Sequence, residues 1–325
     1  MKLLDKIALG LLATLALSGA ARAQEAFPAR PVTVMTAFAA GSGPDAVLRL
    51  VADKLGKAWN QRVAVENRPG GGGFVAIEAA RRAAPDGYTL LQLDSEHLAA
   101  LPLLYKARGF DTLKTFEPVV ALFRTGFLVA VPSDSKFKTM ADLVGAAKAS
   151  PGKLSFGSWG VGSPGHLGGE HLELLSSIEM LHVPFREVSQ LYTSVGAGDV
   201  NWALATLPSS QGAYKAGKIR YIALAGPRRL AQLPDVPTVA ESGGPQGLDV
   251  NSFVVLVAPR SLPAAVRDKI NADVLKALAE PDIKARFDTF GFETLGWNSA
   301  EIERQAAVKA ATYAELVRRK NISLE

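Results

Sequence analysis

The strongest constraint on the fold is an alternation of strand-like and helix-like runs in the first third of the chain. Apolar runs typical of strands occupy residues 31–38, 62–70 and 88–94. Between them, apolar residues recur at helical spacing over 44–59 and 73–87. This order of elements predicts a parallel sheet with helices on its faces.

The pattern changes in the middle of the chain. Residues 116–134 hold two strand-like segments without a full helix between them, and 139–152 are typical of a helix. Residues 154–175 then repeat the opening design of strand, glycine-rich loop and helix. Further strands are expected at 178–185, 200–206, 219–226 and 250–259, followed by a mostly helical tail over 263–320.

These patterns predict two α/β domains with a hinged cleft between them. The chain is expected to leave the first domain near 119–128 and to return near 252–258. We therefore predict domain 1 over residues 24–125 and 253–325, and domain 2 over 126–252. Ligands of open α/β sheets bind at the carboxyl ends of the strands, which would face this cleft.

The first 23 residues have the layout of a secretory signal. Lys2 and Lys6 precede an apolar stretch from Ile7 to Leu17, and Ala21 and Ala23 occupy the small positions of a cleavage site. The alternative is a membrane anchor, but a spanning helix needs roughly 20 apolar residues. The pattern predicts residues 1–23 as a signal peptide cut after Ala23 and a periplasmic protein of a Gram-negative bacterium.

Composition excludes several classes of function. The chain has 36 basic and 31 acidic residues, and it has no cysteine. The absence of cysteine excludes disulfides, thiolate metal sites, cysteine nucleophiles and lipid attachment through an N-terminal cysteine. No basic run is interleaved with aromatic residues, so no nucleic acid partner is expected. No coiled-coil pattern occurs, and a monomer is expected.

The first glycine-rich loop runs from Phe38 to Asp45 and stands directly before a predicted helix. Small side chains let an anion approach the backbone, and a helix N-terminus offers unpaired N–H groups with a partial positive charge. A carboxylate therefore fits here. The alternative is a plain connection shaped by glycine and serine. The candidate ligand-binding residues of this loop are Phe38, Ala40, Gly41, Ser42, Gly43 and Asp45.

The second glycine-rich loop, residues 157–166, has the G-x-G-x-x-G spacing of a dinucleotide site. We expect no such cofactor, because nicotinamide cofactors are not expected outside the cytoplasm; the same backbone could hold a carboxylate. Neither serine has the leading glycine of a G-x-S-x-G elbow, which leaves a nucleophile unsupported. The candidate ligand-binding residues of this loop are Ser158, Trp159, Val161, Gly162, Ser163 and His166.

Other polar residues are interpreted as structural. His166 and His171 are five positions apart, not the four that place two ligands on one helix face, so no metal site is expected. His182 falls in a strand and is expected to be structural. Asp45, Asp94 and Glu96 could do acid–base chemistry, but helix capping by Asp45 and solvated loop positions for the other two are favoured. The glycine run at 70–73 is expected to form a mobile turn rather than an anion site.

The ordered set of motifs resembles the tripartite tricarboxylate transporter receptors, the Bug-type solute-binding proteins of proteobacteria. The resemblance spans nearly the whole mature chain and rests on "VENRPGGGG", "AAPDGYTLL", "PGKLSFGSWGVGSPGHLGGE", "HVPF", "AGKIRYIALA" and "LPDVPTVAESG". It implies two α/β domains like those of a type II periplasmic binding protein, with a cleft that closes on a small carboxylate. We expect a receptor without catalysis or cofactor that partners the membrane permease subunits. The resemblance also implies further ligand contacts around Ser95, Phe185 and Thr206.

The chain departs from the usual family pattern near the cleft. The prolines that flank the first loop in many members are absent, and a frequent F-D-N run is Leu204-Ala205-Thr206 here. The usual asparagine of an A-I-N-P run is Leu101, and a Y-K-G run is Phe185-Arg186-Glu187. Together with Trp159, these changes predict a pocket more apolar than average, suited to an aromatic carboxylate.

Two other functions remain open from the sequence. A serine of the second loop could serve a periplasmic hydrolase, although no base is placed beside it. The same ligand could also be sensed for a two-component kinase, which the chain does not distinguish from transport.

Overall fold

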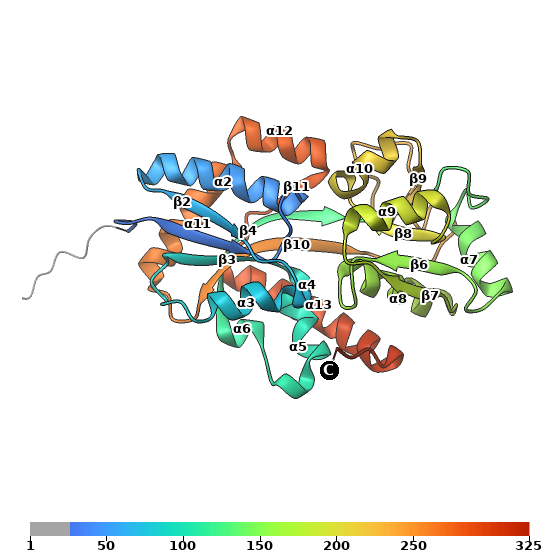
Figure 1. The fold of residues 1–325 in the computed structure, drawn as a ribbon, viewed down its shortest axis with the longest axis horizontal. Helices are drawn as coiled ribbons and strands as arrows, with labels where there is room; N and C mark the ends of the chain where they lie inside the picture. Colours follow the sequence, from blue (N-terminus) through green and yellow to red (C-terminus); the bar gives the residue numbers. More distant parts are fainter. Residues whose placement is uncertain (1–26, 325) are drawn as a thin grey trace, which may run out of the picture.

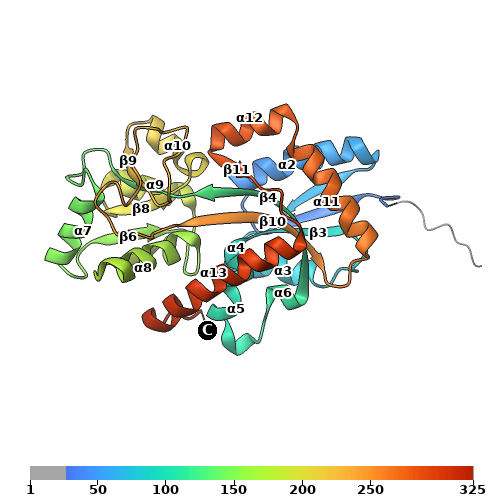
Figure 2. The ribbon, with the colours of Figure 1, turned by 180° about the vertical axis from the view of Figure 1, so that it is seen from behind.

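The computed structural model describes residues 27–324, which form two sheets covered by helices (Figures 1 and 2). The predicted signal peptide and its cleavage site lie outside the described residues. Among the helices of residues 27–324, none is both long and apolar enough to span a bilayer. The predicted fold class of two α/β units is confirmed.

The first sheet has six strands in the order β11-β4-β10-β3-β1-β2. Strand β1, next to the edge strand β2, is parallel to both of its neighbours, whereas β10 is antiparallel to β3 and β4. The parallel part is the strand–helix–strand arrangement expected from the sequence. The bounds are β1 (Val32–Thr36), β2 (Val63–Asn67), β3 (Thr89–Asp94), β4 (Phe116–Gly126), β10 (Asn251–Pro259) and β11 (Phe292–Thr294).

The second sheet has five strands in the order β7-β6-β8-β5-β9. Strand β6 is parallel to β7 and β8, and β5 is antiparallel to β8 and β9. The strands are β5 (Leu128–Pro132), β6 (Ser155–Ser158), β7 (Leu181–Pro184), β8 (Trp202–Ala205) and β9 (Ile219–Leu224).

Helices cover both sheets. We call the first sheet with α2–α6 and α11–α13 the first lobe, and the second sheet with α7–α10 the second lobe. The first lobe contains α2 (Gly43–Trp59), α3 (Phe74–Ala80), α4 (Ser95–Ala99), α5 (Leu101–Leu104), α6 (Thr112–Thr115), α11 (Ala264–Leu278), α12 (Pro281–Phe290) and α13 (Ser299–Lys320). The second lobe contains α7 (Met140–Ala149), α8 (Pro164–Ser176), α9 (Val188–Ala197) and α10 (Leu207–Lys215). Short 3-10 turns lie at Gly71–Gly73 and Lys106–Arg108.

The lobes are joined by the long strands β4 and β10, which extend from the first lobe toward the second in both views (Figures 1 and 2). Strand β4 ends at Gly126 and β5 starts at Leu128, so the chain passes directly from one sheet to the other. It returns to the first sheet at Asn251, where β10 begins. The domain limits at 125/126 and 252/253 remain predictions.

The two faces of the first sheet bury separate apolar cores. In β10, Val255 and Val257 join the cluster beneath α13, whereas Val254 and Leu256 join the cluster beneath α2 and α11. This alternation follows from the two-residue period of a strand. Leu167 of α8 packs in the α13 cluster, so the second lobe contributes directly to a core of the first.

The tail that was expected to be mostly helical contains one further strand. Strand β11 pairs antiparallel with β4, and Phe292 stacks on Phe123 with ring centroids 4.1 Å apart. Three residues are too few to produce a readable alternation, so tertiary packing decides this element. The helix expected over 73–87 is also shorter, because α3 ends at Ala80.

Candidate functional site

The two glycine-rich loops lie where the lobes meet. Each follows the carboxyl end of a strand, β1 or β6, and leads into α2 or α8 (Figure 1). A Cβ placed on Gly43 would lie 3.0 Å from Cγ of Pro208 in α10, and one on Gly162 would lie 2.7 Å from Cδ1 of Leu104 in α5. Each loop therefore approaches the opposite lobe, which is the arrangement required for a shared binding cleft.

The first loop is fixed by the start of α2. Ser42 is the N-cap residue, and its hydroxyl oxygen accepts a hydrogen bond from the N–H of Asp45. Gly41 has a φ of +79°, which favours glycine, and its N–H donates to Oδ2 of Asp45 at 2.8 Å. The sequence predicted that Asp45 would cap α2, but Ser42 is the cap residue. Asp45 instead accepts a hydrogen bond from Gly41, the residue before the cap.

Asp45 is almost fully buried and is the centre of a polar cluster. Arg49 donates to Oδ2 at 3.0 Å, and the side-chain amide of Asn67 donates to Oδ1 at 2.7 Å. Burial alone would raise the pKa of Asp45, but the hydrogen bonds from Arg49, Asn67 and the Gly41 N–H outweigh it and hold the pKa below its ordinary value. The carboxylate is therefore charged and fully engaged in supporting the loop.

Asn67 is a supporting residue that the sequence analysis did not single out. Besides Asp45, its amide donates to the carbonyl of Phe38 at 3.1 Å, and its oxygen accepts from Arg49 at 2.6 Å. It stands at the end of β2, which lies beside β1 in the sheet. The sequence shows Asn67 as the first residue of an N-R-P-G motif. Its contact with the first loop arises only from the pairing of β2 with β1.

The second loop is fixed in the same way by the start of α8. Ser163 is the N-cap residue, and its oxygen accepts from the N–H of His166 at 3.3 Å. Gly162 has a φ of +82°, and its N–H donates to Nδ1 of His166 at 3.1 Å. His166 is buried, with its Nε2 3.6 Å from Oε1 of Glu170 one turn along α8. His166 thus fixes the position of Gly162 in the loop through the hydrogen bond that its Nδ1 accepts.

The two serine hydroxyls of the second loop are engaged inside it. Ser158 is 0% exposed; its hydroxyl donates to the carbonyl of Gly160 at 3.0 Å and lies 2.7 Å from Nε2 of His182. The hydroxyl of Ser163 donates to the same carbonyl at 2.7 Å. Burial lowers the pKa of His182 to about 4, so its ring is neutral at neutral pH.

Some backbone N–H groups are unpaired at both loops. Among the residues that the structure describes, the N–H groups of Ala39, Ala40 and Gly43 in the first loop have no hydrogen-bond acceptor. The same holds for Trp159 and Val161 in the second loop. By contrast, the N–H groups of the φ-positive glycines are consumed within the loops. The arrangement leaves donors from both lobes for an anion.

Aromatic side chains border these donors. Phe38 is half-buried and meets the ring of His97 edge-on at 6.2 Å between centroids. Trp159 stacks on Phe127 at 5.8 Å, and Phe185 packs half-buried in the same lobe. Thr206 caps α10 of the second lobe, with its hydroxyl oxygen accepting from the N–H of Ser209.

Ser95 is placed inside the first lobe rather than at its surface. Its side chain is 0% exposed, donates to Glu96 at 2.9 Å, and accepts from the N–H of Phe253 at 3.3 Å. Its oxygen also lies 3.2 Å from that of Ser252 in β10. In this structure Ser95 ties α4 to a strand that joins the lobes.

The solvated loop positions expected for Asp94 and Glu96 are wrong, because both side chains are buried. Asp94 caps α4 and lies 2.5 Å from Nδ1 of His97. Burial alone would lower the pKa of His97, but the adjacent Asp94 carboxylate raises it above its ordinary value. Glu96 accepts from Tyr313 at 2.7 Å and from Lys309 at 3.1 Å, both in α13.

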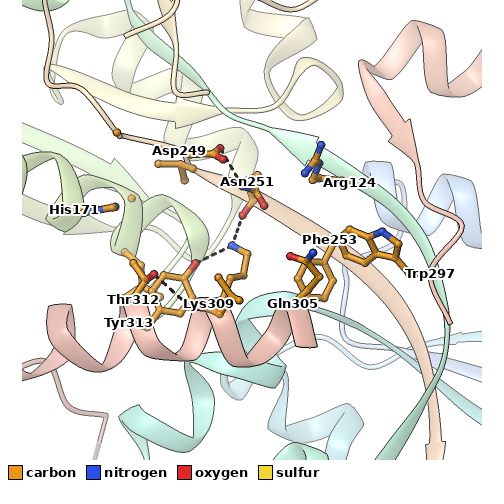
Figure 3. A pocket seen from close by; sticks show the side chains of 15 residues that line it. Arg124, His171, Asp249, Asn251, Phe253, Trp297, Gln305, Lys309, Thr312 and Tyr313 are labelled. Carbon is orange, nitrogen blue, oxygen red and sulfur yellow. Dashed lines mark hydrogen bonds between the residues drawn. The ribbon is translucent and has the colours of Figure 1, made fainter. Parts of the chain in front are cut away.

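Two hollows lie away from the glycine loops. A cavity of about 300 Å³ is enclosed by α13, α8 and the start of β10, with Lys309, Asn251 and Asp249 joined by hydrogen bonds along one side (Figure 3). A second hollow of about 440 Å³ is lined by residues 224–232 and the β11 region. None of the predicted site residues lines either one, and sequence reasoning did not anticipate them.

Within residues 27–324, no group of three or more His, Asp or Glu side chains is arranged to hold a metal ion. The side chains of His166 and Asp45 at the loops already have protein partners. What the loops offer chemically is hydrogen-bond donation to an anion.

Comparison with known proteins identifies the family of the chain. Residues 47–322 match the model of the tripartite tricarboxylate transporter family receptor, TctC. A curated relative from Pseudomonas sp. (strain P51), a UPF0065 protein in the tcbD-tcbE intergenic region, is 34% identical over 272 residues, covering 84% of this chain and 81% of the relative.

Solved structures are similar over almost the whole chain. Rpa4515 from R. palustris, solved with adipate, has a TM-score of 0.83 and 27% identity, covering 91% of this chain and 99% of that one. MatC from Rhodopseudomonas palustris, solved with bound malate, has a TM-score of 0.80 and 26% identity, covering 90% and 100%. The chain therefore belongs to the tripartite tricarboxylate transporter family of receptors, which are periplasmic solute-binding proteins.

Proposed function

We propose that this receptor captures a small carboxylate between its two glycine loops. The observation that carries the proposal is that two strand-to-helix junctions, one from each lobe, each approach the opposite lobe and have unpaired backbone N–H groups. Such groups favour an anion because they add hydrogen bonds to the positive end of a helix dipole. Adipate and malate, present in two similar structures, are both carboxylates.

The ligand class is further proposed to include aromatic carboxylates. Phe38 from the first lobe and Trp159 and Phe185 from the second offer apolar surface beside the donors. Neither the Phe38–Asp45 loop nor the Ser158–His166 loop contains lysine or arginine. A ligand with one carboxylate and a flat apolar body suits this combination better than a tricarboxylate, whose charge needs more cationic partners.

We propose that the remaining site residues act as follows. Ala40, Gly43, Trp159 and Val161 contact the ligand through backbone or ring. Gly41, Ser42, Asp45, Gly162, Ser163 and His166 shape the loops. Ser95 and Ser158, both fully buried, support them from behind, while Phe38, Phe185 and Thr206 border the opening.

The receptor is proposed to have no catalytic activity. A serine hydrolase needs an accessible nucleophile beside a base. Ser158 is buried against His182, and Ser163 uses its hydroxyl to cap α8 and to bond the Gly160 carbonyl. Both serines are explained as parts of the loop scaffold, and sensing for a kinase has no specific observation in its favour.

The export, oligomeric state, partners and domain limits of the receptor are also proposals. We propose export with cleavage after Ala23, a monomeric receptor with no nucleic acid partner, and delivery of the ligand to membrane permease subunits. The two lobes are proposed to correspond to residues 24–125 with 253–325 and to residues 126–252, with β4 and β10 as the hinge.

The decisive experiment compares acids with their uncharged amides. Residues 24–325 would be titrated by calorimetry with adipate, malate and benzoate, and with adipamide, malamide and benzamide. Binding of at least one acid, with at least tenfold weaker binding of its amide, is expected because the donors select a negative charge. Equal affinity for acid and amide would overturn the carboxylate proposal. Tighter binding of adipate than benzoate would remove the aromatic preference only.

A further inference from the structure

The end of α13 reaches out of the first lobe and touches the second. Most of α13 packs on the first lobe, but Nζ of Lys320 lies 3.1 Å from Oε2 of Glu170 and also pairs with Glu173, both in α8. Figures 1 and 2 show the C-terminal end of α13 beside α8. One lysine therefore links the two lobes next to the second glycine loop.

The two acidic residues depend on this lysine. Glu170 and Glu173 are three positions apart on α8 and have side-chain exposures of only 13% and 3%. Two buried carboxylates side by side repel each other and lose hydration, and a buried charge that loses its partner costs several kcal/mol. The positive charge of the Lys320 ammonium compensates the negative charges of both carboxylates.

Glu170 connects the lysine to the loop. Its Oε1 lies 3.6 Å from Nε2 of His166, whose Nδ1 accepts the N–H of Gly162. Because Nδ1 accepts, a neutral imidazole carries its proton on Nε2, the nitrogen that faces the carboxylate. Glu170 thus favours the tautomer whose Nδ1 accepts the Gly162 N–H.

The chain after α13 touches the same loop independently. The N–H of Leu324 donates to the carbonyl of Leu104 at 3.0 Å. Leu104 and Leu324 are also the two side chains nearest to a Cβ placed on Gly162, at 2.7 and 3.4 Å. The second glycine loop therefore lies against Leu104 and Leu324 of the first lobe, while Lys320 contacts the helix α8 that follows the loop.

We propose that Lys320 is an interlobe positioning residue for the ligand loop of the second lobe, acting through Glu170 and His166 on the N–H of Gly162. This rests on the proposed function, because only a ligand-binding cleft gives the loop geometry a purpose. The loop is fully shaped only with the end of α13 seated on α8. Ligand affinity then depends on how the lobes are arranged and not only on the loop sequence.

The first test needs no ligand. The ring nitrogens of His166 and the amide exchange of Gly162 would be followed by nitrogen-15 NMR in Lys320→Met, Lys320→Arg and Arg318→Met. We expect Lys320→Met to speed exchange of the Gly162 amide about tenfold and to mix the His166 tautomers, because one hydrogen bond is weakened. Lys320→Arg, which keeps the charge, and Arg318→Met, an exposed neighbour, should resemble the wild type.

A second pair of variants separates positioning from general stability. Glu170→Gln breaks the path to His166, whereas Glu173→Gln leaves the Lys320–Glu170 contact in place. Faster Gly162 exchange in Glu170→Gln but not in Glu173→Gln supports the proposal. Equal effects of the two variants, or no effect of Lys320→Met, would overturn it.

Calorimetry with the acid that the wild type binds best then connects the loop to binding. Affinity is expected to fall at least fivefold in Lys320→Met and to recover in Lys320→Arg. If the wild type binds no acid of the panel, the proposed function fails while the exchange data still decide the role of Lys320. If Lys320→Met changes exchange but not affinity, its role in ligand binding is refuted.

Discussion

The two glycine loops are built on one plan with different side chains. In the first, Gly41 precedes the cap Ser42, and the third helical residue, Asp45, receives the glycine N–H. In the second, Gly162 precedes the cap Ser163, and His166 occupies the same third position with the same bond. Both glycines have φ near +80°, at +79° and +82°. Two unrelated stretches of sequence thus solve the same local problem alike.

What differs is where each loop finds its support. Asp45 is paired with Arg49 four residues along its helix and with Asn67 of its own lobe. His166 faces Glu170 four residues along, and Glu170 is held by Lys320 of the other lobe. The first loop is self-contained, whereas the second depends on the meeting of the lobes. The comparison teaches that the same backbone design can be supported within one lobe at the first loop and by both lobes at the second.

The largest effect is expected from removing the first loop's central carboxylate. Asp45→Ala leaves the Gly41 N–H, Arg49 and Asn67 without their acceptor in a buried setting, which should cost about 3 kcal/mol of unfolding free energy. Urea denaturation measures this cost. Asp53→Ala removes an exposed carboxylate of the same helix and serves as the control, with a change within about 0.5 kcal/mol. A loss of under 1 kcal/mol for Asp45→Ala would contradict the self-contained first loop.

The matched glycines should respond unequally. Alanine is strained at a positive φ in both, by about 1 kcal/mol. A Cβ at Gly41 meets nothing within 4 Å, but one at Gly162 lies 2.7 Å from Leu104. We expect Gly41→Ala to lose about 1 kcal/mol and Gly162→Ala about 2 kcal/mol or more, with the excess reporting contact between the lobes. Equal losses in thermal unfolding would argue against that contact.

The histidines of the two lobes should have opposite pH effects. His97 has a raised pKa in the folded state beside Asp94, so its contribution is complete below the unfolded pKa of about 6.5 and is lost as pH rises through the folded value. His182 has a lowered pKa of about 4 among Ser158, His166 and Glu170, so its contribution is complete above about 6.5 and is lost as pH falls toward 4.

Variants at these histidines make the comparison measurable. Between pH 7 and pH 4.5 the melting temperature of His182→Asn should fall less than that of the wild type, because a group that resists protonation has been removed. The melting temperature of His97→Asn should fall more than that of the wild type, because the favourable protonation of the folded-state imidazole has been lost. Identical pH profiles for the two variants would show that neither ring responds to its lobe as described.

The smallest expected effect concerns ligand choice. Trp159→Leu should weaken benzoate about fivefold and adipate less than twofold, because an aromatic ring loses more stacking surface than an aliphatic chain does. Phe38→Leu provides the same change in the other lobe. Calorimetric titrations measure both ratios. A larger loss for adipate than for benzoate would assign Trp159 to the scaffold rather than to the ligand.

Much of the fold was predictable because its signals are local. Apolar runs marked β1, β3 and β10, and small residues with serine and proline marked the starts of α2 and α8. The family resemblance was confirmed by the matching family model. Local signals suffice for these elements because a strand, a loop and a cap depend on residues within a few positions of one another.

The contacts that support the site were not predictable in the same way. Asn67 reaches Asp45 across a strand pair, and Lys320 reaches Glu170 from the far end of the chain. Asp94 and Glu96 looked solvated because carboxylates are mostly exposed, yet β10 and α13 bury them. Such partners are set by tertiary packing, which a periodicity within one segment does not encode.

The seating of the C-terminal residues has a practical consequence for anyone who labels or immobilises this receptor. Leu324 rests against Leu104 at the seam of the two lobes, whereas Phe27 packs with Trp59 and Tyr88 in the first lobe at the other end of the described chain. A purification tag or dye fused after the C-terminal residues would disturb the contact of Leu324 with Leu104 and Gly162 and distort the measured affinities. Handles attached ahead of Phe27 leave that contact free, and sensors made from this receptor should be anchored there.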